Sequence, residues 1–173
     1  LMEQGKMKES QEAMKESLKV ASEITDDYDK SLAYGEISKV LMEQGKMKES
    51  LKVASEITGD YEKPWLYREI SKVLIEQGKM KESLKVASEI TRDYNKSRAY
   101  REISKVLMEQ GKMKESQEAM KESLKVASLI TSDWEKSDAY KEISKVLMEQ
   151  GKMIESQEAM KESLKVASEI TSH

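Results

Sequence analysis

The chain of 173 residues contains no cysteine, no phenylalanine and a single proline, Pro64. Without cysteine, neither a disulfide nor a thiolate metal site can form. Because proline and glycine are scarce, long stretches are free to be helical, and the abundant Ala, Leu, Lys, Glu and Met are good helix formers. These absences favour an all-α protein.

The sequence also lacks several hallmarks of nucleic-acid-binding and membrane proteins. Acidic and basic residues nearly balance at a net charge of −3, which is typical of solvated helix faces and not of nucleic-acid binding through bulk charge. No apolar run reaches the ~18 residues that a membrane span needs. No basic and apolar leader opens the chain, so we expect a cytoplasmic location if the protein is natural.

No motif of an enzyme is present. The one histidine, His173, is the last residue, and we interpret it as a tail or a tag remnant. The glycines punctuate turns and form no phosphate loop, the serines have no histidine partner, and the carboxylates recur without metal-ligand spacing. We therefore expect no catalytic residue, no metal and no cofactor, and no membrane, nucleic-acid or small-molecule partner.

What the sequence does contain is one recurring stretch, EISKVLMEQGKMKES. It stands whole at 36–50 and 102–116 and, with single changes, at 69–83 and 142–156. The glycines at its centre lie 33 or 40 residues apart, at Gly5, Gly45, Gly78, Gly111 and Gly151. A fixed period of this size predicts a solenoid. The predicted fold is a right-handed all-α solenoid of antiparallel helix pairs, with about nine helices.

Within one repeat, apolar residues recur at helical spacing on both sides of the glycine. Tyr34, Ile37 and Leu41 precede Gly45, and Met47 opens a second stripe after it. Because glycine takes a positive φ without penalty, Gly45 is expected to end the first helix. The repeat is thus predicted to be helix A (about 31–44), a turn, and helix B (about 46–58).

The period divides the chain into a single array over 1–173. A truncated first repeat covers 1–30, with a turn at Gly5 and a helix B at about 6–25, and full repeats follow at about 31–63, 64–96, 97–136 and 137–173. Serine or proline is expected to start each helix A. The preceding connectors each contain an aromatic residue, which we interpret as a plug between repeats. These aromatics are Tyr28, Tyr61, Tyr94 and Trp134.

Three of the helix B segments carry seven extra residues, at 11–17, 117–123 and 157–163. Seven residues add about two turns, or ~10 Å. Helix A is not visibly longer to match, so we expect the extra turns to project and to contact another chain; the alternative, an internal accommodation, stays open. The residues that would form this self-association surface are Met7, Met14, Met120, Leu129, Ile154 and Met160.

The spacing of Tyr34, Ile37–Ser38, Leu41, Gly45, Met47 and Ser50 resembles the tetratricopeptide repeat, although the period is 33 where that family usually has 34. The resemblance implies binding of an extended peptide or a partner helix in a groove lined by helix A. A basic stripe there would suit carboxylates, while neighbouring glutamates would partly neutralise it. The implied groove positions are Lys39, Trp65, Arg68, Lys72, Arg101, Lys105, Lys141 and Lys145.

The near-identity of the repeats bears on function and origin. Residues 102–128 and 142–168 differ only at Lys114 versus Ile154, which favours an engineered or redesigned array over a recent natural duplication. The expected function is a non-catalytic scaffold for protein–protein interaction or self-assembly. The alternatives are a natural adaptor that binds an acidic peptide or partner helix, and, less favoured because the groove is not net basic, a single-stranded RNA reader.

Overall fold

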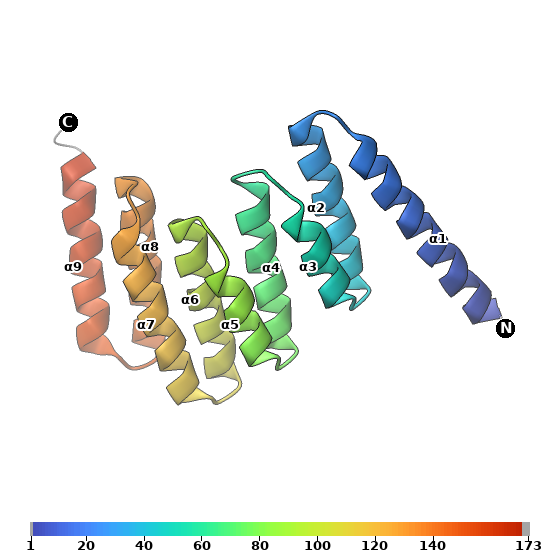
Figure 1. Ribbon diagram of the computed structural model, residues 1–173. Helices are drawn as coiled ribbons and strands as arrows, with labels where there is room; N and C mark the ends of the chain where they lie inside the picture. The colour runs from blue at the N-terminus through green and yellow to red at the C-terminus, as the bar shows by residue number, and fades with distance from the viewer. Residues whose placement is uncertain (1, 171–173) are drawn as a thin grey trace. The chain divides into compact units, whose positions relative to one another are not determined.

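The computed structural model describes residues 2–170, and side chains from residue 5 onward. This range contains nine α-helices and no strand, which confirms the all-α fold (Figure 1). No helix in it is both long and apolar enough to cross a membrane. The helices are α1 (Met2–Glu23), α2 (Asp27–Glu43), α3 (Met47–Ser55), α4 (Glu62–Glu76), α5 (Met80–Ser88), α6 (Asp93–Glu109), α7 (Met113–Leu129), α8 (Asp133–Glu149) and α9 (Met153–Ile170).

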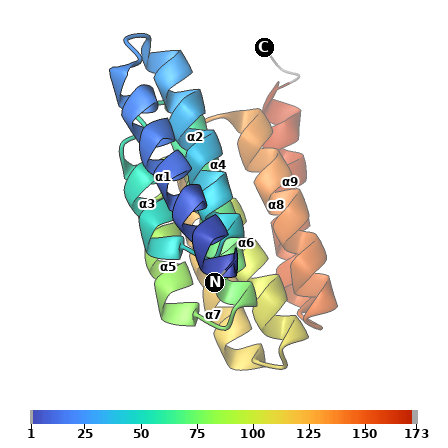
Figure 2. The ribbon, with the colours of Figure 1, turned by 90° about the vertical axis from the view of Figure 1, so that its right-hand side faces the viewer.

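The chain divides into two compact units, Leu1–Tyr67 and Arg68–His173, with the boundary inside α4. In the first unit, α2 and α3 form an antiparallel hairpin, as helix A and helix B of one repeat. In the second unit, α6 pairs with α7 and α8 with α9 in the same way (Figures 1 and 2). The predicted pairing of helix A with helix B is therefore confirmed within each unit.

The turns fall on the predicted glycines. Gly45, Gly78, Gly111 and Gly151 have φ of 74° to 76°. At the end of α6, the N–H of Gly111 donates to the carbonyl of Met108 (2.9 Å) and that of Lys112 to the carbonyl of Leu107 (2.8 Å). This pair of bonds is the Schellman motif, which satisfies carbonyls that the end of the helix leaves without a partner.

Gly5 does not behave like the other repeat glycines, so the predicted turn at this position is wrong. The helix α1 runs from Met2 to Glu23 without a break. The positive φ of the other four glycines is taken where a complete helix A must fold back on helix B. The described residues before Gly5 belong to α1 itself, so the backbone continues through Gly5 as helix with its i→i+4 hydrogen bonds.

Helix A begins earlier than predicted, because the N-cap is not the serine expected from the sequence. The N-cap of α2 is Asp26, whose carboxylate accepts the N–H of Asp29 (2.9 Å), and the N-cap of α8 is Ser132. The serines that were expected to start the helices, such as Ser31 and Ser97, lie one turn inside and are buried. Pro64 does lie in the first turn of its helix, where no intrahelical donor is lost.

The early start of helix A also overturns the prediction that the seven-residue extensions project, for those in α7 and α9; the extension in α1, at 11–17, is mostly exposed. The helix α6 has 17 residues and its partner α7 also has 17, whereas the unextended α3 and α5 have 9 each. At ~1.5 Å per residue, the extended helix B therefore matches helix A in length. The extension is absorbed inside the hairpin, and Ser123 at its end is fully buried.

The core of the second unit lies between successive hairpins. Met120 and Ala127 of α7 pack against Ala139, Ile143 and Val146 of α8 in one buried cluster. The half-buried side chains of Leu124, Tyr94 and Tyr140 close the edge of this cluster. The apolar stripe of helix B thus serves as the surface on which the next helix A stacks.

Candidate functional site

Paired serines hold helix A to helix B, and the bonding is reciprocal in α2–α3, α6–α7 and α8–α9. Ser104 of α6 donates its hydroxyl to the carbonyl of Ser116 (2.7 Å), and Ser116 of α7 donates to the carbonyl of Ser104 (2.6 Å). We call such a reciprocal pair a serine clamp. Because the serine side chain is small, the two backbones approach closely at the clamp, and the buried hydroxyls remain satisfied.

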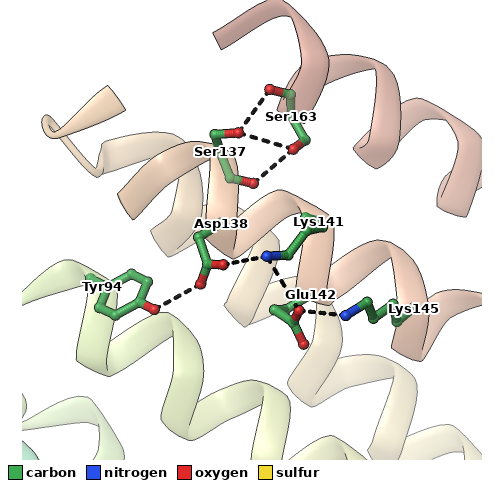
Figure 3. A network of polar contacts seen from close by, with 7 residues as sticks. All are labelled: Tyr94, Ser137, Asp138, Lys141, Glu142, Lys145 and Ser163. Atoms are coloured by element: carbon green, nitrogen blue, oxygen red, sulfur yellow. Dashed lines mark hydrogen bonds and ion pairs between the residues drawn. The ribbon is translucent and has the colours of Figure 1, made fainter. Parts of the chain in front are cut away.

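The long hairpins have a second clamp that the short ones lack. In α6–α7 the hydroxyls of Ser97 and Ser123 bond to each other's carbonyls at 2.9 and 2.8 Å. Figure 3 shows the equivalent pair, Ser137 and Ser163, in α8–α9. The second serine of each pair is supplied by the seven-residue extension. The repeat of serine at this spacing in both helices was the signal in the sequence, and sequence reasoning missed it.

Two glutamines next to the turns reach back to the preceding repeat. The amide of Gln150 donates to the hydroxyls of Ser104 (2.8 Å) and Ser116 (2.7 Å), so it docks on the clamp of the hairpin before it. Gln110 donates to the carbonyl of Ile75 at 3.2 Å. Gln150 is 8% exposed and its buried Oε1 has no hydrogen-bond partner among the described residues. These contacts fix the register between hairpins of the second unit.

The predicted groove positions of the first unit, Lys39 and Trp65, do come together. The ammonium of Lys39 lies 4.9 Å from the centroid of the Trp65 ring, within cation–π range. Lys39 also forms an ion pair with Glu36, one turn earlier in α2. The Trp65 side chain stays partly exposed beside this pair.

In the second unit, three of the predicted basic residues form ion pairs with carboxylates: Arg68, Lys141 and Lys145. Arg68 is buried, bonds to Glu69 at 2.8 Å and lies 3.8 Å from Glu102 of α6. Glu102 also accepts from Arg98, one turn earlier in its own helix (3.1 Å). The Arg68 Nε and Glu102 Oε2 atoms that face each other are buried and make no hydrogen bond. The row of bases therefore begins as a set of ion pairs between neighbouring helices.

Arg101 differs from its neighbours, because it is 8% exposed and makes no ion pair within the described residues. Burial lowers the pKa of its guanidinium, while the charges of Glu142 and Glu102 oppose that shift. The cation is thus balanced at a distance, by carboxylates on α6 and α8.

A polar network on α6 and α8 completes this surface (Figure 3). Tyr94 donates to Asp138 (2.8 Å), Lys141 donates to the other oxygen of Asp138 (2.6 Å), and Lys145 donates to Glu142 (2.7 Å). Burial alone would raise the pKa of Asp138, but the bonds from Lys141 and Tyr94 outweigh it and lower that pKa. Burial and the bond to Asp138 raise the pKa of the Tyr94 hydroxyl.

Among the predicted groove residues of the second unit, Lys72 and Lys105 are exposed and form no ion pair with the described residues. The others form or approach ion pairs with Asp138, Glu69, Glu102 and Glu142. The helix A surface therefore alternates in sign. An acidic ligand would have to compete with these internal carboxylates, and its binding in the groove stays a prediction.

Three of the four connector aromatics are not plugs between repeats, so the interpretation is wrong for these three. Tyr28, Tyr61 and Trp134 are exposed. Tyr28 and Trp134 lie in the first turn of a helix A, because these helices begin earlier than expected. Tyr94 is half-buried and packs at the edge of the core cluster. Tyr28, Tyr61 and Trp134 are thus surface groups that a partner can reach.

The residues predicted to form a self-association surface have different surroundings. Met120 is 1% exposed and belongs to the core, so its place on that surface is wrong. Met7, Leu129 and Ile154 are exposed, while Met14 and Met160 are half-buried. Since the extensions of α7 and α9 do not project, Leu129 and Ile154 lie on helix faces and not on a protruding tip.

Comparisons with known proteins show a shared fold and no family. No protein family and no curated protein sequence matches the chain. Among solved structures it is similar to BtubC (BKLC) from P. vanneervenii, with a TM-score of 0.53 and 11% identity, over 99% of this chain and 77% of that one. At this identity the likeness shows the helical fold alone.

Proposed function

We propose that the chain is a non-catalytic scaffold of tetratricopeptide-like repeats, engineered or redesigned, that acts by protein–protein interaction, including association with copies of itself. The observation that carries this proposal is an apolar stripe on α9, formed by Met153, Met160 and Leu164. Spacings of 7 and 4 residues place these side chains on one side of the helix. Leu164 is 64% exposed and Met153 53%.

Two of the three members of the same stripe are covered elsewhere in the protein, while the third, Met113, is 39% exposed. On α7 the equivalent residues are Met113, Met120 and Leu124, and there Met120 and Leu124 pack in the cluster formed with α8. The sequence of the stripe is the same in both helices. The stripe on α9 is therefore a stacking surface without a described neighbour, and apolar patches of this kind mark interaction sites.

The test is the mass of the protein in solution as a function of concentration. We expect the mass to rise above the 19.8 kDa of one chain. Leu164→Gln should return it to one chain, since it places an amide in the stripe. Glu169→Gln, which puts the same side chain at an exposed position off the stripe, is the matched control and should leave association unchanged. A single-chain mass at every concentration would refute self-association through α9.

A further inference from the structure

A second bare surface lies on α1 and is of a different kind. Residues 5–22 have the same sequence as 111–128, which form α7 and the turn before it. In α7 the face formed by Ser116, Ala119, Met120 and Ser123 is buried beneath neighbouring helices. In α1 the equivalent Ser10, Ala13 and Ser17 are exposed, and Met14 is half-buried. The same sequence therefore has this face buried on α7 and largely exposed on α1.

The covered copy shows which chemistry fits this face. On α7 the serines are met by Ser97 and Ser104 of α6, which form the two clamps. The α7 hydroxyls donate to the main-chain carbonyls of Ser97 and Ser104. A partner helix with larger side chains at these positions would hold the backbones apart and bury the hydroxyls without a hydrogen bond, which costs free energy. On α9, Ser163 and Ser156 are met in the same way by Ser137 and Ser144 of α8.

The face of α1 is available for such a partner. The hydroxyl of Ser17 bonds to the carbonyl of Ala13 in its own helix (3.0 Å), where its counterpart Ser123 bonds to another helix. Figure 1 shows α1 joined to α2 at its C-terminal end, where Ala21 is buried, and diverging from the α2–α3 hairpin toward its N-terminus.

We infer that the face of α1 formed by Ser10, Ala13, Met14 and Ser17 is a docking site for an amphipathic helix of a partner polypeptide with the helix A pattern. That pattern is two serines seven residues apart, with alanine two residues and isoleucine six residues after the first serine, as in Ser97, Ala99, Ile103 and Ser104. The inference rests on the proposed scaffold function and names a class of partner for it. The docked helix forms two serine clamps with α1, as α6 does with α7.

The test uses the full chain and a labelled synthetic peptide with the sequence of residues 92–110, followed by fluorescence anisotropy. We expect saturable binding. A peptide carrying Ser97→Leu and Ser104→Leu should bind with an affinity lower by about tenfold or more. A tenfold change in Kd is ~1.4 kcal/mol, and each lost buried hydrogen bond costs about that. Ser17→Arg in the protein should weaken binding by a similar factor. Ser22→Arg should not, because Ser22 and its counterpart Ser128 are both exposed.

Three outcomes would overturn the inference. No binding at about millimolar peptide is one. Binding that Ser17→Arg leaves unchanged is another, since it would place the peptide on a different surface. The third is self-association of the chain that Ser17→Arg abolishes but that the peptide does not inhibit. This result would assign the face to a second copy of the chain. The first two results do not bear on the α9 stripe, whose test uses Leu164→Gln, so the two proposals can fail separately.

Discussion

Serine is the residue on which the hairpins depend. Serine in a helix interior usually competes with the backbone for hydrogen bonds and contributes little to packing. Here Ser104 and Ser116 direct their hydroxyls across to the facing helix, so that two short polar side chains replace an apolar layer. The clamp is a buried polar contact in which each donated hydrogen bond is satisfied, so it specifies the register of the two helices.

The first prediction concerns one clamp and its bare copy. Ser123→Ala removes a buried hydroxyl and the hydrogen bond that it donates to the carbonyl of Ser97, so the free energy of unfolding should fall by about 1 kcal/mol. Ser17→Ala changes the same residue in the same local sequence on the exposed face of α1, and should alter stability by no more than about 0.5 kcal/mol. Urea unfolding followed by circular dichroism measures both. Equal effects would show that the clamp contributes nothing beyond helix propensity.

At the scale of the helix, the period and the glycines were sufficient to predict the hairpins. They failed at helix ends whose position depends on packing against an adjacent helix. Gly5 and Gly111 have the same following sequence, yet Gly5 lies inside α1 and Gly111 ends α6. Gly111 follows α6, which folds back onto α7, whereas residues 2–4 before Gly5 are already part of α1. The start of helix A was also misplaced, because the rule that serine caps helices gave Ser31 a role that Asp26 has. That error led to the prediction that the extensions project.

The candidate site was predictable to a lesser degree. The stripe of bases on helix A follows from helical spacing, but its ion pairs do not, since Arg68 finds Glu102 only once α4 and α6 are stacked. Burial of Arg101 depends on stacking in the same way. The clamps could have been found, because Ser97, Ser104, Ser116 and Ser123 repeat at the same spacing in both helices. A single sequence does not say which polar residues of a stripe face each other.

The second prediction compares the two kinds of glycine. Gly111 has φ of +75°, where alanine would have its Cβ close to the carbonyl oxygen, so Gly111→Ala should destabilise the protein by about 1–2 kcal/mol. Gly5→Ala should stabilise α1 slightly, by at most about 1 kcal/mol, because alanine is the better helix former. Beyond the adjacent backbone, a Cβ at either position would meet no atom within 4 Å, so the two sites differ in backbone conformation and not in the space around them. Thermal unfolding should show shifts of opposite sign; a loss at both positions would place Gly5 in a turn.

At the scale of the whole chain, stability should be unevenly distributed. In a helical repeat array, stability is approximately a sum over repeats and the interfaces between neighbours. The long hairpins α6–α7 and α8–α9 each have two serine clamps, and Gln150 links one to the next. In the first unit, α3 has 9 residues and one clamp, Ser38 with Ser50, and most of α1 is exposed.

This difference predicts the order in which the backbone opens. Amides of α7 and α8 should exchange with deuterium more slowly than those of α3 and α1, because their helices are longer, more buried and tied at two points. Ser123→Ala should then accelerate exchange in α6 and α7 and leave α2 and α3 unchanged, whereas Ser50→Ala should do the reverse. Mass spectrometry of peptic fragments resolves these segments. Equal protection throughout, or a response of every helix to either substitution, would mean that the chain opens as one cooperative body and that the clamps do not set local stability.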